Sequence, residues 1–593
     1  MKKIKILSLM LFFALLSCKN ETAKVATKSV NKPFNDFLDN YNEETYKLYP
    51  INATFEGDNR FNDKLPNYSS DEFLAEAITF YTKVKADLAQ FNDADLSESE
   101  KLSKAVLAWE SDIKLEGFKF RQELMPIDQF NSMTLTIGQL AGGTSAQPFK
   151  TVKDYDNWLK RLDSYVNNLE SSEVKMIEGI NKGYVLPKSL IIKIIPQFES
   201  LGKDDVENHV FYGPVKNIPE TFSVDEKKNI TAAYTKIIKE KIIPAHKKMA
   251  NFISKEYLVA GRATSGISDI PNGKEYYNFR IKNFTTITLT ADEIHNLGLR
   301  EVERIRLEME KVKSQVGFKG DLKAFFDFVR NRKELIPFTE PQQVIDNFNA
   351  IHEKMKPQIE KLFNKKPKTP FEVRRTEAFR EASASAEYYQ GSLDGTRPGI
   401  FYVPIPEITS YNIHKDEDLF LHEAIPGHHY QISLTQESTV LPKFRKTLWY
   451  SAYGEGWALY TESLGKELGL YTDPYQYFGM LSGDMHRAIR LVVDTGIHTK
   501  DWSREKAIQY SMDNEPVSEA GIISEIERYM AYPGQALSYK IGQLKIRELR
   551  TKAEKELGDK FDIKEFHNQV LETGSIPLKL LEDKINVWIE ASK

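Results

Sequence analysis

The sequence predicts a mainly α protein with minor β strands. Apolar residues recur at the three- and four-residue spacing of amphipathic helices from about residue 33 onward, clearly so over 70–113 and 151–182. Few segments have the composition of strands, and the best two are Tyr276–Phe284 and Gly399–Val403.

Helix boundary signals support this prediction. The 151–182 segment is followed by Gly183, a typical residue beyond a helix end. Thr290 and Glu293 have the spacing of a capping box, which predicts a helix reaching about Val316. A long helix is expected over 224–258, kinked or split at Pro244.

The composition is that of an ordinary globular protein. The 593 residues are 41% apolar and 28% charged, which excludes a wholly disordered, collagen-like or polytopic membrane protein. The net charge of −4 gives no basic excess, so no nucleic-acid partner is expected. A single cysteine excludes an internal disulfide framework and any thiolate-rich metal site.

The N-terminus reads as an export and anchoring signal. Three lysines among the first five residues precede an apolar run over 6–16, too short to span a bilayer, so 1–17 are expected to be a signal peptide. The run ends at Leu16-Ser17-Cys18, which resembles the lipobox of bacterial lipoproteins. A lipidated Cys18 with a polar tether over 18–32 would anchor the chain in the cell envelope, facing either the periplasm or the outside. The alternative is a plain signal peptide with an incidental cysteine.

The sequence predicts an indistinct domain boundary in the mature chain near residue 270. We expect a helical scaffold over 33–270 and a helical catalytic region over 271–593. Six of the 11 histidines lie between residues 414 and 498, which places the candidate chemistry in the second region.

The segment HEAIPGHH, beginning at His422, carries a candidate zinc site. Imidazoles are good zinc ligands, and Glu423 next to the first of them is placed to act as a general base. In the usual HExxH helix the two histidines are four residues apart and share one face. His428 is six residues from His422, a rotation that points two rings about 240° apart on a regular helix. His429 restores the face but adds about 10 Å of rise, too far for one ion.

Pro426 and Gly427 offer a way to close this gap. Proline interrupts the helical hydrogen bonds, and glycine adopts backbone angles that other residues avoid. A bulge of these two residues would carry His428 to the place of the second ligand, with His429 as the alternative. The competing interpretation is a helix ending at Ile425, followed by a turn with surface histidines.

A second motif supplies a third ligand. Glu455, in YGEGWALY, lies 33 residues after His422. Two histidines and one glutamate around an open position are the ligand set of thermolysin-type hydrolases. Glu462 is seven residues further along the same helical face, so it is the rival ligand or a residue that orients one.

These motifs resemble a known family. HEAIPGHH and YGEGWALY, followed by the segments Arg490–His498 and Tyr532–Tyr539, resemble the DUF885 family of bacterial proteins, as do upstream segments at 183–197 and 291–305. The architecture is similar to the helical zinc peptidases of the thimet oligopeptidase and angiotensin-converting enzyme kind. That similarity implies two helical lobes around a deep cleft and one Zn²⁺ ion. It also implies His422, His428 and Glu455 as ligands, with Glu423 as base.

Other residues are candidates for stabilising a transition state. One helical face carries Arg487, Arg490, Asp494 and His498, and Asp494 could orient His498. The related peptidases use Tyr or His as oxyanion donor, which makes His498 and Tyr539 the candidates here. The alternative is a structural ladder of salt bridges along this face.

The segment around Gly399–Val403 is a candidate for substrate binding. A short edge strand beside the zinc helix could pair with an extended peptide. Arg397 is then a candidate for a substrate carboxylate, and Tyr402 and Tyr532 are candidates for other substrate contacts. Arg487, Arg490 and Lys540 are further cations that could hold a peptide C-terminus.

Together these features predict a zinc-dependent metallohydrolase, best read as a peptidase cleaving short peptides. A zinc amidase or esterase acting on non-peptide substrates is the first alternative. A surface lipoprotein that binds peptides without cleaving them is the second. Under each interpretation, the protein is expected to contact the membrane through the lipid anchor.

Overall fold

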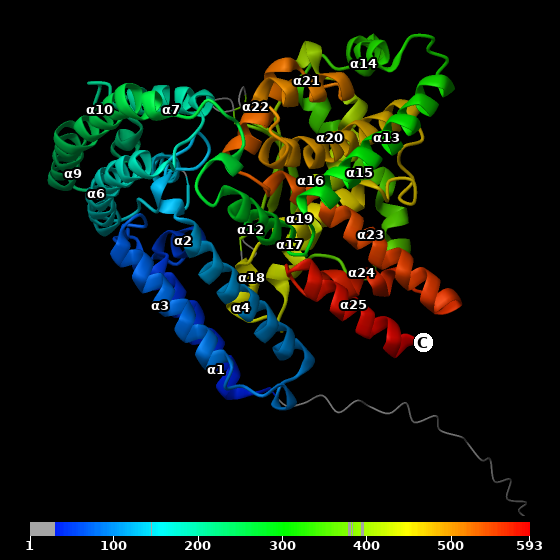
Figure 1. Cartoon of the computed structure of the whole chain (residues 1–593), viewed down its shortest axis with the longest axis horizontal. Helices are drawn as coiled ribbons and strands as arrows, with labels where there is room; N and C mark the ends of the chain where they lie inside the picture. Colours follow the sequence, from blue (N-terminus) through cyan, green and yellow to red (C-terminus); the bar gives the residue numbers. More distant parts are fainter. Residues whose placement is uncertain (1–29, 144, 378–380, 382–383, 393–396) are drawn as a thin grey trace, which may run out of the picture.

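The computed structural model describes residues 30–143, 145–377, 381, 384–392 and 397–593, and it confirms the mainly α fold (Figure 1). Cys18 and the predicted signal peptide lie outside the described residues. The helices of the first half are α1 (Lys32–Leu48), α2 (Pro50–Phe55), α3 (Asp71–Leu88), α4 (Glu98–Gly117), α5 (Met133–Ala141), α6 (Val152–Lys182), α7 (Lys188–Leu201), α8 (Gly213–Lys216), α9 (Val224–Ile237), α10 (Ile243–Phe252) and α11 (Leu258–Ala260).

The second half adds the remaining helices. They are α12 (Gly273–Thr285), α13 (Ala291–Gln315), α14 (Leu322–Asn331), α15 (Pro341–Leu362), α16 (Asp416–Glu423), α17 (His428–Glu437), α18 (Lys443–Thr447), α19 (Ser451–Glu462), α20 (Pro474–Thr499), α21 (Arg504–Asn514), α22 (Glu519–Ala531), α23 (Ser538–Leu557), α24 (Ile563–Leu571) and α25 (Leu578–Ser592).

Local sequence signals explain several of these boundaries. Capping boxes open α6 at Thr151 and α13 at Thr290, and Gly183 ends α6 with φ of 80°. The expected helix over 224–258 is continuous but irregular, because π-helical turns at 238–242 and 253–257 interrupt it. Pro244 lies directly after the first π turn, within this continuous path, where proline removes one helical hydrogen bond.

The strand predicted at Tyr276–Phe284 is wrong, because this segment lies within α12. Its aromatic residues favour a strand locally, but Tyr276, Tyr277 and Phe279 are all buried in the main core. Consecutive buried positions show that α12 is covered on more than one side, and this packing decides its conformation.

The small sheet has the order β1 (Phe371–Arg375), β3 (Gly399–Val403), β2 (Glu387–Tyr389). β3 pairs in parallel with β1 and antiparallel with β2. The predicted strand is therefore confirmed, but its expected edge position is wrong. With a neighbour on each side, β3 has no free edge for a peptide over its paired residues.

The buried apolar residues form several cores. One core combines residues of α1 and α4, such as Phe34 and Leu107, with residues of α12, α19, α23 and α25. A second core holds α6, α7, α9 and α10 together, and these helices form a lobe at the left of Figure 1. A third core lies between α13, α14, α20 and α22.

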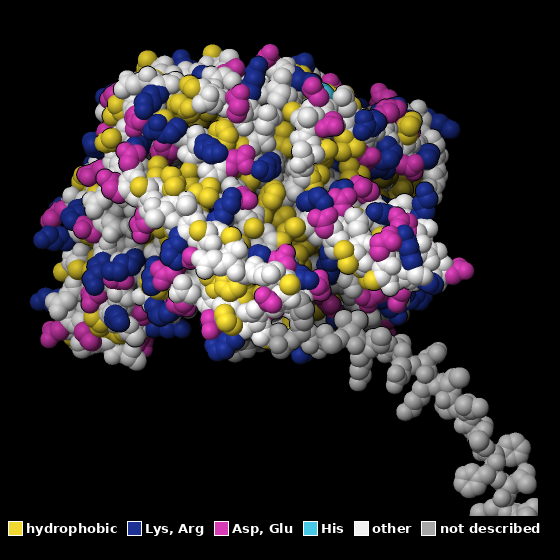
Figure 2. Space-filling model, turned by 60° about the horizontal axis from the view of Figure 1, so that its bottom comes forward, with side chains coloured by type: hydrophobic (Ala, Val, Ile, Leu, Met, Phe, Trp, Pro, Cys, Tyr) yellow, Lys and Arg dark blue, Asp and Glu magenta, His cyan; other side chains and the backbone are white. Residues whose placement is uncertain are grey.

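The surface carries charges of both signs. Figure 2 shows Lys and Arg interspersed with Asp and Glu around small hydrophobic patches, without a stripe of one sign on this face. Among the helices that the structure describes, none combines the length and the apolar character that crossing a membrane requires.

Candidate metal centre

The HEAIPGHH segment forms two helices with a tight connection, not one helix with a bulge. α16 ends at Glu423 and α17 begins at His428. A side chain at Gly427 would put its Cβ 1.9 Å from the carbonyl oxygen of His422, so only glycine fits. The Trp457 Nε1–H donates to the carbonyl of Pro426 at 2.8 Å and fixes the connection to α19. His428 thereby returns to the end of α16.

Three side chains converge at this break. Ligand atoms of His422, His428 and Glu455 all lie within 4.8 Å of one another. The Nε2 atoms of His422 and His428 are 3.6 Å and 3.5 Å from the same oxygen of Glu455. The two imidazole rings are nearly perpendicular, at 87°, with centroids 4.9 Å apart.

The two rival ligands lie outside this cluster. Glu462 approaches the far side of the first imidazole, with Oε1 2.7 Å from Nδ1 of His422. A carboxylate there holds the proton on Nδ1 and orients the ring so that Nε2 faces Glu455. His429 points toward the sheet, where its Nδ1 lies 3.0 Å from the hydroxyl of Tyr388.

The electrostatics of the cluster are those of a buried charged site. Burial alone would raise the pKa of Glu455, but hydrogen bonds with His422 and His428 hold it well below its usual range. Burial lowers the pKa of His422, and the hydrogen bonds with Glu455 and Glu462 more than reverse this, raising it to about 10. This excess of negative charge around two imidazoles suits a cation.

Glu423 is the last residue of α16 and is 8% exposed. Burial raises its pKa, while the charges of His422, His428 and Arg487 act in the opposite direction. Arg487 on α20 donates to the Gly483 carbonyl and lies 3.8 Å from Glu462. A carboxylate of raised pKa beside the cluster is what a general base requires.

Tyr539 on α23 lies close enough to the cluster for the charge of Glu455 to act on its hydroxyl. Helices α19 and α23 meet at two glycines, where a Cβ on Gly456 would lie 2.5 Å from the Cα of Gly542. Burial raises the pKa of Tyr539, and Glu455 raises it further. The guanidinium of Arg490 lies 4.4 Å from the centroid of the Tyr539 ring.

His498 does not belong to the centre, and the expectation that Asp494 orients it is wrong. Its Nδ1 accepts from the Ile267 N–H and its Nε2 lies 3.0 Å from the Tyr529 carbonyl. Asp494 instead accepts hydrogen bonds from the Tyr277 hydroxyl and the Gly534 N–H. Helical spacing places Asp494 and His498 on one face of α20, but they form hydrogen bonds with different neighbouring segments.

The remaining substrate candidates have partners elsewhere. The Arg397 guanidinium donates to the Gln390 carbonyl and covers the Tyr389 ring, so it closes its own hairpin. Tyr402 pairs across β3 in the middle of the sheet. Tyr532 packs against Phe284 and under the guanidinium of Arg280.

The cations proposed for a peptide C-terminus are also engaged. Lys540 pairs with Glu301 at 3.0 Å and with Asp484. Arg490 pairs with Glu525 at 3.0 Å, although its buried Nη1 has no hydrogen-bond partner within the described part of the chain.

Trp449 is a site residue that sequence reasoning missed. It is 47% exposed, and its ring lies 5.8 Å from that of His428. The indole packs directly on Gly454, next to the candidate ligand Glu455. A lone tryptophan before YGEGWALY carries no spacing signal, so only the structure reveals this position.

Two solved structures are similar to this chain over nearly its whole length. A crystal structure of the "putative lipoprotein" from Colwellia psychrerythraea is similar over 94% of this chain and 99% of that chain, with 26% identity and a TM-score of 0.85. A "putative lipoprotein of unknown function" from Shewanella oneidensis shares the fold, at 19% identity and a TM-score of 0.72, over 93% of this chain and 99% of that chain. Among curated proteins, none matches this chain.

The family comparison covers nearly the whole described chain. Residues 50–585 match the family described as "Bacterial protein of unknown function (DUF885)". Because this match spans well over half of the sequence, including His422, His428 and Glu455, the chain belongs to the DUF885 family.

Proposed function

We propose that the protein is a zinc-dependent hydrolase that cleaves short peptides. The observation that carries the proposal is the convergence of His422, His428 and Glu455 within 4.8 Å, with the buried Glu423 beside them. Two imidazole nitrogens and one carboxylate leave an open position, which is the donor set of catalytic zinc sites.

The donor set fits zinc in its details. Glu462 holds the proton on Nδ1 of His422, so that Nε2 is free to bind a cation. His422, His428 and Glu455 would hold the ion. A bound zinc ion supplies a Lewis acid that acidifies water and polarises a carbonyl group.

The surrounding residues supply the proton transfers and the binding of charge. Glu423 accepts the proton of the attacking water on its carboxylate and delivers it to the leaving amine. Tyr539 donates a hydrogen bond to the substrate oxygen that gains negative charge. Its raised pKa keeps this hydroxyl protonated at neutral pH.

The site favours short, extended substrates. His422, Glu423 and His428 are each less than 9% exposed, so a folded protein surface cannot reach them. Trp449, exposed beside His428, offers an aromatic surface for a substrate side chain.

We also propose that Cys18 anchors the protein in the cell envelope. The lipobox-like sequence supports this, as do the two similar structures, each described as a lipoprotein. Cys18→Ser should move the protein from the membrane fraction to the soluble fraction, and persistence in the membrane fraction contradicts the anchor.

The activity is tested on zinc-loaded protein with short peptides, acylated small molecules and a chelator. Glu423→Gln should keep the ion and lose activity by roughly 10²–10⁴-fold. The exposed Glu505→Gln is the control and should behave as wild type. Turnover of acylated small molecules but not peptides would favour the amidase or esterase. Saturable peptide binding without any zinc-dependent turnover would favour the non-catalytic binding protein.

A further inference from the structure

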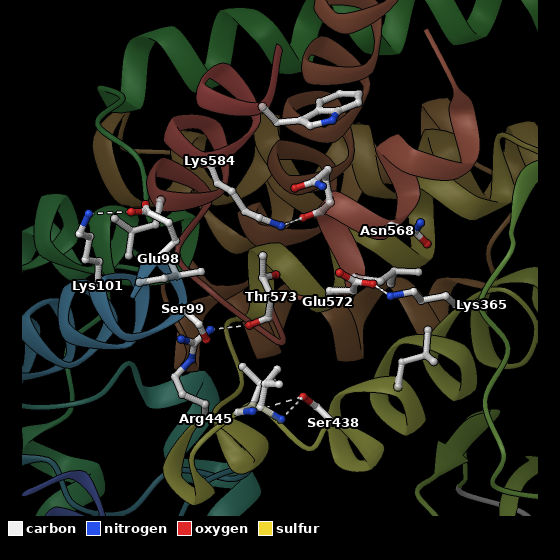
Figure 3. Close-up of a pocket in the computed structure, with 18 of the residues that line it drawn as sticks. Glu98, Ser99, Lys101, Lys365, Ser438, Arg445, Asn568, Glu572, Thr573 and Lys584 are labelled. Carbon is white, nitrogen blue, oxygen red and sulfur yellow. Dashed lines mark hydrogen bonds and ion pairs between the residues drawn. The ribbon is translucent and has the colours of Figure 1, made fainter. Parts of the chain in front are cut away.

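A cavity of about 1170 Å³ lies apart from the metal centre, between α4, the end of α17, α24 and α25 (Figure 3). None of the three candidate metal ligands lines it. Its volume is at the upper end of the range for small-molecule sites in proteins. The cavity therefore has room for a ligand of its own.

Part of the cavity wall is apolar. Its side chains come from four separate segments and include Leu102, Phe363, Leu434, Leu580, Val587 and Trp588. Apart from the indole N–H of Trp588, these side chains offer no hydrogen bonds, so a peptide backbone placed against them would give up most of its hydrogen bonds to water without replacement. A hydrocarbon chain suits this wall.

Lys584 provides a cation within the cavity. Figure 3 shows it extending from α25, with its ammonium group donating to the backbone carbonyl of Gln569. In the described chain no carboxylate lies within ion-pair distance of this ammonium group. Lys365, on the other side of the cavity, is instead paired with Glu572.

Lys584 is charged under physiological conditions. Burial lowers its pKa to about 8, with the neighbouring Lys365 acting in the same direction and Glu565 opposing it. The ammonium group therefore remains mostly protonated at neutral pH, with one backbone carbonyl as partner for its three N–H donors. An anionic group would complete its hydrogen bonding.

The cavity lies beside the point where the chain enters the folded body. Asn31 donates its backbone N–H to Glu100 at 2.8 Å and its side chain approaches the Asp95 carbonyl. Glu98, Ser99 and Lys101, which flank Glu100, line the cavity. Eleven residues lie between Cys18 and Val30, and an extended chain over that interval spans at most about 40 Å. An anchor at Cys18 would keep this cavity near the lipid surface.

We propose that this cavity binds a single-chain amphiphile with an anionic head group, such as a long-chain fatty acid taken from the membrane. The hydrocarbon chain lies along the apolar wall, and the head group accepts hydrogen bonds from Lys584. The membrane as source rests on the lipid anchor proposed above, whereas the binding itself does not depend on the metal centre.

The test is isothermal titration of the chain from residue 18, carrying Cys18→Ser, with oleate below its micelle concentration. We expect one saturable site per chain. Lys584→Met should weaken binding by about tenfold or more, because a charge-assisted hydrogen bond is lost. Val587→Glu places a second anion on the apolar wall and should weaken binding similarly. Oleyl alcohol should bind more weakly than oleate and should not respond to Lys584→Met.

Lys579→Met is the matched control, because Lys579 lies on the same helix, is exposed and pairs with Asp583. It should bind oleate within about twofold of wild type. Val587 is 68% exposed, so its substitution leaves folding intact, which circular dichroism can verify. Absence of a saturable site, or oleate binding unaffected by both Lys584→Met and Val587→Glu, overturns the proposal. So does binding to phosphatidylglycerol vesicles without any binding of free oleate.

Discussion

Glu462 lies 2.7 Å from Nδ1 of His422, on the side of the imidazole that faces away from Glu455. The two residues come from α19 and α16, and Thr461 strengthens the same junction by donating to the Leu421 carbonyl at 2.9 Å. The carboxylate fixes the tautomer of the first ligand. Glu462 therefore lies outside the cluster of His422, His428 and Glu455 and is placed to orient His422.

Glu462→Gln should weaken zinc binding by about 10–100-fold while the fold is retained. The amide keeps the shape of the side chain but removes the charge that favours the Nδ1–H tautomer. Competition with a fluorescent chelator measures the affinity. Glu467→Gln, on the surface and paired with Arg550, is the control. Equal zinc affinities for the two variants would show that Glu462 has no orienting role.

Gly427→Ala should disrupt the connection between the two histidine helices. The added Cβ meets two backbone carbonyl oxygens, those of His422 and Leu421, and neither can move without displacing a ligand. We expect a loss of about 1–3 kcal/mol in the free energy of unfolding, together with weaker zinc binding.

Gly138→Ala is the control for this substitution, since a Cβ there contacts nothing within 4 Å and the residue lies within α5. It should be neutral or slightly stabilising in urea unfolding. If Gly427→Ala unfolds at the wild-type urea concentration and binds zinc normally, the close approach of the connection to α16 is not required.

Tyr539→Phe should lower kcat by roughly 10²–10³-fold and leave zinc binding unchanged, because a donor to the developing negative charge is lost. Tyr532→Phe should have little effect, since the Tyr532 ring contacts Phe284 and Arg280 and its hydroxyl has no described role. Steady-state kinetics on one short peptide compare the two. A larger loss in Tyr532→Phe would reverse the assignment of the donor.

His498→Asn should lower stability without changing zinc affinity, because both ring nitrogens of His498 contact the backbone. Burial lowers the pKa of this imidazole to about 3, with Arg262 and Arg280 adding to the shift. Between this pKa and the ordinary pKa of about 6.5, His498 is therefore neutral in the folded state and protonated in the unfolded state. In wild type His498 therefore lowers the free energy of unfolding of the protein as the pH falls below about 6.5.

The asparagine variant lacks that loss, so its destabilisation should shrink as the pH falls. The change is about 1.4 kcal/mol per pH unit between roughly pH 6.5 and pH 4. Urea unfolding of both proteins at pH 7 and pH 5 measures the difference. A destabilisation that is constant or grows toward pH 5 would show that His498 is not a buried neutral histidine.

The sequence was sufficient to predict features with a strong local signal. Capping boxes and helical periodicity identified α6 and α13, and the two motifs identified three residues that converge in space. Helix geometry also showed that HEAIPGHH cannot be one regular helix. The candidates for the second ligand could therefore be narrowed to His428 and His429. Which of the two lies near His422 depends on the backbone conformation of Pro426 and Gly427, which the sequence does not give.

Features decided by distant packing could not be predicted in this way. Tyr276–Phe284 has strand-like composition, yet burial on several sides makes it helical. The partners of Asp494 and His498 come from elements more than 30 residues away in the sequence. The contact of Trp449 with His428 likewise depends on how the loop before α19 lies over the metal centre.

The metal centre is tested most directly by anomalous diffraction at the zinc edge from a crystal of the zinc-loaded protein. We expect one strong peak about 2.0–2.2 Å from Nε2 of His422, from Nε2 of His428 and from a carboxylate oxygen of Glu455. A peak coordinated by His429 or directly by Glu462, or no peak between α16 and α19, would contradict it.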